Sequence, residues 1–189
     1  MIKRIPKKIT YENLEKYAFK YIEKYLTTEN QLKKILKKKI IKTSFILKTK
    51  PEDYIDFIDK IAEKFKTIGL IDDKKFCENR ALNLIKRGFS KRKILMNLKH
   101  KGINDEIAKI GIGNLEKFFF NYELASALIY AKKKKIISFN TKKNYEENKK
   151  SLIQMSRAGF TYDITKKIIN LNSEKEFLEL EKYANDGDV

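Results

Sequence analysis

The sequence is poor in residues that interrupt helices and in residues that build covalent or metal sites. Its 189 residues include two prolines, seven glycines, one cysteine, one histidine and no tryptophan. The single cysteine, Cys77, excludes an intramolecular disulfide and a cysteine-clustered zinc site. It falls on the apolar face of a predicted helix, so we expect a buried, unreactive thiol. Scarce Pro and Gly beside abundant Lys, Ile, Leu and Glu favour an all-α protein.

Two further absences concern membranes and export. No run of the sequence approaches the roughly 18 consecutive apolar residues that a membrane-spanning helix needs. The first ten residues are basic, but no apolar segment follows them as it does in a secretory signal. We therefore expect a cytoplasmic protein without a membrane partner.

The inventory of reactive side chains argues against an enzyme. The only histidine, His100, lies between Lys99 and Lys101, and no nearby Cys or Ser completes a nucleophile arrangement. A Walker-type glycine loop is absent. Asp72 and Asp73 are adjacent acids, but helix capping explains them more simply than metal binding does. We predict no catalytic residue, no cofactor and no metal site.

The charge of the chain is strongly one-sided. The 43 Lys and Arg residues exceed the 25 Asp and Glu residues, for a formal net charge of +18. Such an excess opposes compaction unless a polyanion or an acidic protein surface offsets it. Nucleic acid, or a complex that contains it, is therefore the natural partner. The alternative is that scattered lysines only keep the protein soluble.

Apolar periodicity predicts three units of three helices each. The units span residues 11–71, 72–120 and 121–172, and an acidic tail with a frayed end covers 173–189. Thr28, Ser90, Asn104 and Thr161 are predicted helix caps. We expect a loop over residues 42–50, a polar loop over 138–141, and a kink or early fraying at Gly111 and Gly113.

Local similarities between the units support this count. Ser90 and the residues after it resemble Thr28 and its successors, and Gly102-Ile103 resembles Gly159-Phe160. Chance likeness between amphipathic helices is the alternative. A stripe of Tyr17, Tyr21 and Tyr25 shares its helix face with Leu14 and Ala18, so we expect core packing with hydroxyls at the rim rather than base stacking.

These motifs together resemble a known family. Gly69-Leu-Ile-Asp-Asp-Lys-Lys-Phe, then Arg87-Gly88-Phe89-Ser90, then Lys101-Gly102-Ile103, are similar in order and spacing to the RecX family of recombination regulators. Weaker similarity extends over about residues 11–170 and includes Arg157-Ala158-Gly159-Phe160 near the end. Two departures are Thr28, where the family usually has Ser, and Lys39-Ile40-Ile41, where a Gly normally ends the second helix.

The resemblance implies a protein that modulates, and usually inhibits, the RecA recombinase. Family members are elongated tandem helical units that bind along the groove of the RecA filament on single-stranded DNA and suppress its ATPase and strand exchange. The same resemblance places the chain among proteins of DNA repair and the SOS response. We expect a monomer. The competing hypothesis is a helical DNA-binding protein that acts without recombinase.

Basic residues cluster where two helices are predicted to meet. Lys86 and Arg87 end one helix and Lys91–Lys93 open the next, so the turn at Gly88 should bring them to one edge. Positive charge opposes the dipole at a helix N-terminus, which favours a binding role for Lys91–Lys93 over a structural one. For each residue taken singly, a solvated surface charge is the alternative. The filament- or DNA-facing candidates are Lys86, Arg87, Lys91, Arg92, Lys93, Lys99, Lys101 and Arg157.

Overall fold

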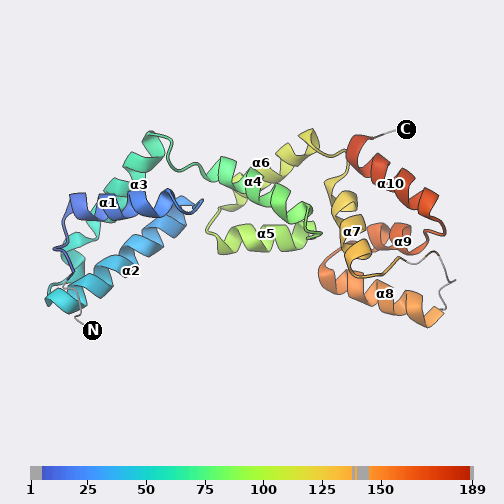
Figure 1. Ribbon diagram of the computed structural model, residues 1–189, viewed down its shortest axis with the longest axis horizontal. Helices are drawn as coiled ribbons and strands as arrows, with labels where there is room; N and C mark the ends of the chain where they lie inside the picture. Colours follow the sequence, from blue (N-terminus) through green and yellow to red (C-terminus); the bar gives the residue numbers. More distant parts are fainter. Residues whose placement is uncertain (1–5, 138, 140–144, 188–189) are drawn as a thin grey trace. The chain divides into compact units, whose positions relative to one another are not determined.

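The computed structural model describes residues 6–137, 139 and 145–187, and over these residues the protein is helical and has no β-strand (Figure 1). The predicted all-α class is confirmed. None of the described helices is long and apolar enough to cross a membrane. The predicted polar loop at 138–141 falls largely outside the described residues.

The elements follow one another along the chain as a series of α-helices with two short 3₁₀ helices. They are α1 (Tyr11–Ile22), α2 (Glu29–Leu47), η1 (Pro51–Tyr54), α3 (Asp56–Thr67), α4 (Asp73–Ile85), α5 (Lys91–His100), α6 (Asp105–Gly113), η2 (Asn114–Lys117), α7 (Tyr122–Lys133), α8 (Tyr145–Ala158), α9 (Tyr162–Ile169) and α10 (Glu174–Asp186).

These elements form two compact units. The first unit comprises the chain up to Phe76 together with Lys101–Ile103, and the second comprises Cys77–His100 and the chain from Asn104 onward. The short segment Lys101–Ile103 therefore packs with helices that precede it by many residues. The division into three repeats, with boundaries after residues 71, 120 and 172, stays a prediction.

The first unit is a bundle of α1, α2 and α3 around an aliphatic core. Its most deeply buried side chains include Leu32, Leu36 and Ile61, which are inaccessible to solvent. Thr10 caps α1 by accepting a hydrogen bond from the Asn13 amide at 3.2 Å. Capping and a single apolar face per helix are enough to explain why each of these segments folds as it does.

One expectation for the first unit is wrong and a second holds only in part. The segment 42–50 is mostly helical, because α2 continues to Leu47 and ends on the left-handed residue Lys48. Thr43 and Ser44 occupy the buried face after Ile40, so polar residues interrupted the apolar stripe without ending the helix. The tyrosine stripe is core only in part: Tyr21 packs against the core, whereas Tyr17 and Tyr25 are 37% and 57% exposed, and α1 ends at Ile22 before Tyr25.

The second unit contains α5 to α10 and most of α4. Asn104 and Thr161 cap α6 and α9 as predicted. The α-helical hydrogen bonding of α6 ends at Gly113 and gives way to η2, which matches the expected irregularity there. Cys77 is buried, as predicted, and packs so close to Gly111 that a side chain at 111 would collide with it.

The acidic tail is better ordered than expected. Residues 174–186 form the helix α10, which Ser173 caps by accepting from the Glu176 amide at 3.1 Å. Phe177 and Ala184 are buried against the core of α7 to α9. The backbone also ties this helix to the chain before α7, because the Asn121 amide donates to the Ala184 carbonyl at 2.8 Å. The fraying predicted for this tail is therefore absent from residues 174–186, and residues 188–189 lie outside the described part of the chain.

Candidate functional site

The turn between α4 and α5 places the predicted basic residues at the surface of the second unit. Gly88, at φ +83°, reverses the chain where its backbone passes the α7 backbone at Tyr130. Ser90 follows, fully buried, and caps α5 by accepting from the Lys93 amide at 3.4 Å. The side chains of Lys86, Arg87 and Lys91–Lys93 are all exposed.

Three cations surround a cleft of about 470 Å³ in this unit. Its charged lining consists of Lys93 from α5 and of Lys150 and Arg157 from α8, and no acid lines it. Tyr130 and Ile153 give the cleft an apolar wall. Within the described parts of the chain, none of the three cations forms an ion pair. This basic cleft can hold an anionic group such as a phosphate without displacing an internal carboxylate.

The cleft gathers only two of the predicted residues. Lys93 and Arg157 line it, whereas Lys86, Arg87, Lys91, Arg92 and Lys99 do not. Arg87 instead lies over the Phe89 ring at 5.2 Å, and its carbonyl accepts from the Lys133 ammonium at 3.3 Å. Burial raises the pKa of Glu123, and the nearby Lys91 charge opposes that rise.

Sequence reasoning missed Lys150 and Tyr130. Lys150 lies seven residues before Arg157 on α8, with Ile153 and Gln154 between them, so all four share one helix face. That spacing was a signal that could have identified Lys150. Tyr130 comes from α7, and nothing local in the sequence connects it with α5 or α8.

Lys101 has a structural role through its backbone. The Thr28 hydroxyl caps α2 by accepting from the Gln31 amide at 3.1 Å, and it donates to the Lys101 carbonyl at 2.7 Å. The same arrangement recurs in the second unit, where the Ser90 hydroxyl donates to the Ala158 carbonyl at 2.7 Å. Each carbonyl precedes a glycine with positive φ, Gly102 or Gly159. The sequence similarities between Thr28 and Ser90, and between Gly102 and Gly159, thus reflect the same contact in both units. In each, one hydroxyl caps a helix and also donates to the carbonyl of a distant turn.

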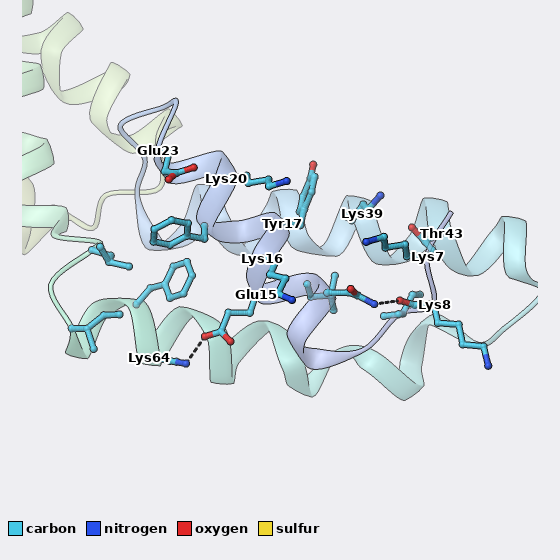
Figure 2. Close-up of a pocket in the computed structure, with 17 residues that line it drawn as sticks. Lys7, Lys8, Glu15, Lys16, Tyr17, Lys20, Glu23, Lys39, Thr43 and Lys64 are labelled. Carbon is cyan, nitrogen blue, oxygen red and sulfur yellow. Dashed lines mark hydrogen bonds and ion pairs between the residues drawn. The ribbon is translucent and has the colours of Figure 1, made fainter. Parts of the chain in front are cut away.

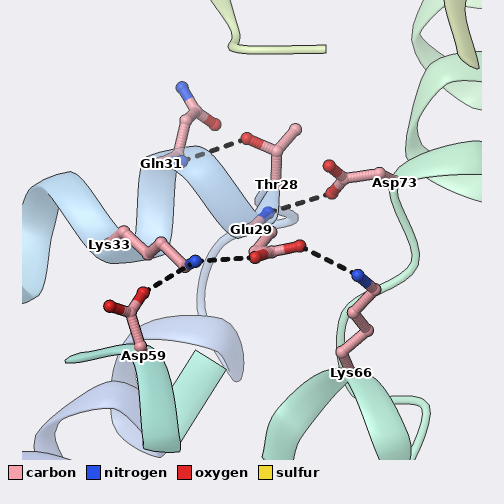
Figure 3. Close-up of polar contacts among 7 residues, drawn as sticks. All are labelled: Thr28, Glu29, Gln31, Lys33, Asp59, Lys66 and Asp73. Atoms are coloured by element: carbon pink, nitrogen blue, oxygen red, sulfur yellow. Dashed lines mark hydrogen bonds and ion pairs between the residues drawn. The ribbon is translucent and has the colours of Figure 1, made fainter. Parts of the chain in front are cut away.

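Charged residues surround the first of these junctions (Figure 3). The Glu29 amide, at the start of α2, donates to Asp73 Oδ1 at 2.9 Å. Lys33 Nζ lies 2.9 Å from Glu29 and 2.8 Å from Asp59, and the carboxylates of Asp59 and then Glu29 raise the pKa of Lys33 to about 12. Burial raises the pKa of Asp73 above its ordinary value, although the Glu29 amide opposes this.

The two adjacent acids are capping residues, as predicted. Asp72 Oδ1 accepts from the Lys75 amide at 2.9 Å at the start of α4, whereas Asp73 serves the start of α2. No group of His, Cys, Asp or Glu that could hold a metal ion occurs among the described residues. Both carboxylates are therefore engaged in hydrogen bonds that organise helix ends.

Comparisons with known proteins agree on one family. No family profile matches the chain. It is 27% identical over 169 residues to a Regulatory protein RecX of Myxococcus xanthus, covering 88% of this chain and 89% of that protein. It is 31% identical over 116 residues to a Regulatory protein RecX of Finegoldia magna, covering 60% of this chain but only 55% of that protein. A Clostridioides difficile protein of the same name is 30% identical over 120 residues, or 61% of this chain and 53% of that one.

The fold agrees as well. A crystal structure of RecX from Lactobacillus salivarius superposes with a TM-score of 0.60 at 22% identity, covering 84% of this chain and 94% of that one. The sequence similarity to the Myxococcus protein spans nearly the whole of both chains, so it includes the motifs at 69–76, 87–90 and 101–103. Over nearly its whole length the chain is similar in sequence and in fold to proteins of the RecX family.

Proposed function

We propose that this protein regulates the RecA recombinase by binding the RecA filament on single-stranded DNA and inhibiting its ATPase and strand exchange. It acts as a cytoplasmic monomer and performs no chemistry itself. The observation that carries the proposal is the basic cleft, in which Lys93, Lys150 and Arg157 form no ion pair with any described residue, in a chain similar to RecX proteins.

The cleft fits an anion that belongs to a larger assembly. Three cations around about 470 Å³ can hold one or two phosphates or a cluster of carboxylates, but they do not enclose a small ligand. Contacts of this kind are individually modest, and they become strong when one protein spans several subunits of a filament. Binding across a subunit boundary would hinder the subunit motions that ATP turnover needs.

The test is RecA ATPase activity on a single-stranded oligonucleotide with increasing amounts of the protein. We expect ATP hydrolysis to fall to a low plateau. Reversing Lys150→Glu and Arg157→Glu together should raise the half-inhibitory concentration about tenfold or more, because favourable charge contacts become repulsive. The matched control reverses Lys109→Glu and Lys117→Glu, two exposed lysines of the same unit that lie outside the cleft, and should leave inhibition nearly unchanged.

A lack of inhibition and of any change in filament lifetime at saturating protein would refute the proposal. The competing function, a DNA-binding protein that needs no recombinase, is distinguished by affinity. A filament regulator binds the RecA-coated strand much more tightly than the bare strand. A plain DNA binder binds both equally and, if two phosphates meet the cleft, loses affinity with a log–log salt slope of about −1.4.

A further inference from the structure

The first unit contains a second, larger groove that the proposed function does not use. It has a volume of about 780 Å³ and runs along the exposed face of α1, between α2 and α3 (Figure 2). Binding sites for ligands usually fall in the range of about 300–1,000 Å³. All its lining residues, from Lys7 to Leu70, belong to the first unit.

The charged lining of this groove is predominantly positive. Six lysines and two glutamates line it, which leaves a net charge of +4; they are Lys7, Lys8, Lys16, Lys20, Lys39, Lys64, Glu15 and Glu23. Lys64 forms an ion pair with Glu15. In Figure 2, Lys7, Lys8 and Lys39 gather at one end of the groove, Glu23 lies toward the other, and Lys16 and Lys20 lie between them. A ligand for this groove therefore carries several negative charges.

The same groove exposes apolar side chains that a small folded unit would normally bury. Phe19, Ile68 and Leu70 all line it and are 45%, 58% and 43% exposed. Contiguous exposed apolar residues beside charged ones are typical of surfaces that bind another protein. A ligand for this groove therefore carries apolar side chains as well as negative charge.

We propose that this groove binds an acidic, amphipathic segment of another protein. The apolar side chains of that segment pack on Phe19, Ile68 and Leu70, and its carboxylates lie against Lys16, Lys20 and the lysines at the far end. This is the helix-in-groove mode of peptide recognition, with the charge of the partner specified. The inference holds whether or not the protein acts on RecA.

A nucleic-acid strand fits the groove less well. Proteins usually bind single-stranded nucleic acid by stacking successive bases on aromatic side chains. Tyr17 and Phe19 are two positions apart on α1 and so point about 200° apart around the helix, which prevents a shared platform. Lys39 already lies over the Tyr17 ring at 5.2 Å. The aliphatic side chains of Ile68 and Leu70 offer a nucleotide neither a hydrogen bond nor an aromatic face for stacking.

Occupants from this chain itself are also disfavoured. A second copy carries the same net charge of +18, so long-range repulsion opposes its approach to a positive groove. The residues that precede the groove-lining segment include Lys3 and Arg4, which would add positive charge rather than neutralise it. The positive field of the groove repels both a second copy and the N-terminal residues of the chain, but it attracts an acidic segment of another protein.

The test is fluorescence anisotropy with a labelled probe peptide and the full-length protein. In the first peptide, Leu and Phe recur at every third or fourth position and Glu or Asp fill the remaining positions. A second peptide, the Ser peptide, has Ser in place of every Leu and Phe. Oligo(dT) serves as the nucleic-acid probe. Saturable binding of the first peptide, and much weaker binding of the Ser peptide, is the expected result. The variant Lys16→Gln with Lys20→Gln should weaken binding about three- to tenfold.

Two further variants separate the groove from general charge attraction. Replacing Ile68→Ser and Leu70→Ser should weaken the peptide about tenfold without unfolding the protein, because both side chains are already exposed. Replacing Lys34→Gln and Lys37→Gln removes the same charge from exposed positions of α2 outside the groove and should change little. No saturable peptide binding, or equal losses in the control variant, would overturn the inference. Binding of oligo(dT) that depends on Lys16 and Lys20, without peptide binding, would overturn it in favour of a nucleic-acid site.

Discussion

Gly88 is the residue on which the geometry of the basic edge depends most, and replacing it with alanine tests that geometry. Its φ of +83° costs an L-residue about 1–2 kcal/mol. An added Cβ would lie 2.9 Å from the Tyr130 amide nitrogen and 3.0 Å from its Cα, in the backbone of α7. A helix backbone cannot rotate aside as a side chain can, so we add about 1–3 kcal/mol for overpacking. We expect Gly88→Ala to destabilise the second unit by about 3 kcal/mol.

Urea unfolding followed by helical circular dichroism measures this loss, with two other glycines as references. Gly69, at φ +74°, has open space around its Cβ position, so Gly69→Ala should lose only the backbone penalty of about 1 kcal/mol. Gly113 has helical φ of −59° and open space, so Gly113→Ala should gain about 0.5–1 kcal/mol. A Gly88→Ala variant as stable as Gly69→Ala would refute the reasoning, because the contact with Tyr130 would then be free to relax.

Three further predictions concern the junctions. Ser90→Ala should lower the free energy of unfolding by about 2 kcal/mol, because it removes a helix cap and leaves the Ala158 carbonyl without its donor. Ser90→Thr keeps the hydroxyl, so in the same urea assay it should retain most of the wild-type stability. Burial raises the pKa of Asp73 in the folded state, so the folded state binds protons more tightly than the unfolded state, and stability from this group is lost as pH rises from about 4. Asp73→Asn keeps an oxygen that can accept from the Glu29 amide but has no charge to bury. The stability of this variant relative to wild type should therefore increase from pH 4 to pH 7. A stability difference that stays constant over this pH range would contradict the prediction. Lys33→Gln breaks two half-exposed ion pairs and should cost about 0.5 kcal/mol at low salt and less at high salt, as seen in thermal unfolding at both.

Local sequence patterns determined the class of this protein and most of its helix boundaries. Thr28, Ser90, Asn104 and Thr161 were identifiable as caps because capping needs only a short polar side chain a few residues before an apolar stripe. The similarity to RecX proteins was recognisable for the same reason: the motifs that carry it are turns and caps, whose residue types depend on local backbone geometry. The end of α2 could not be identified from the sequence, because the polar residues Thr43 and Ser44 fill buried positions where a hydropathy pattern predicts exposure.

What only the tertiary structure decided is which of these local features meet. Nothing near Thr28 or Ser90 indicates that each hydroxyl also donates to a distant carbonyl, at Lys101 or Ala158. The basic residues looked like one continuous edge in the sequence, yet the cleft joins only Lys93 and Arg157 and adds Lys150 and Tyr130. The physical reason is that periodicity and capping are short-range, so they specify each helix and its buried face. Which helices become neighbours depends on how all of these buried faces pack together, and binding surfaces form where the neighbouring helices meet.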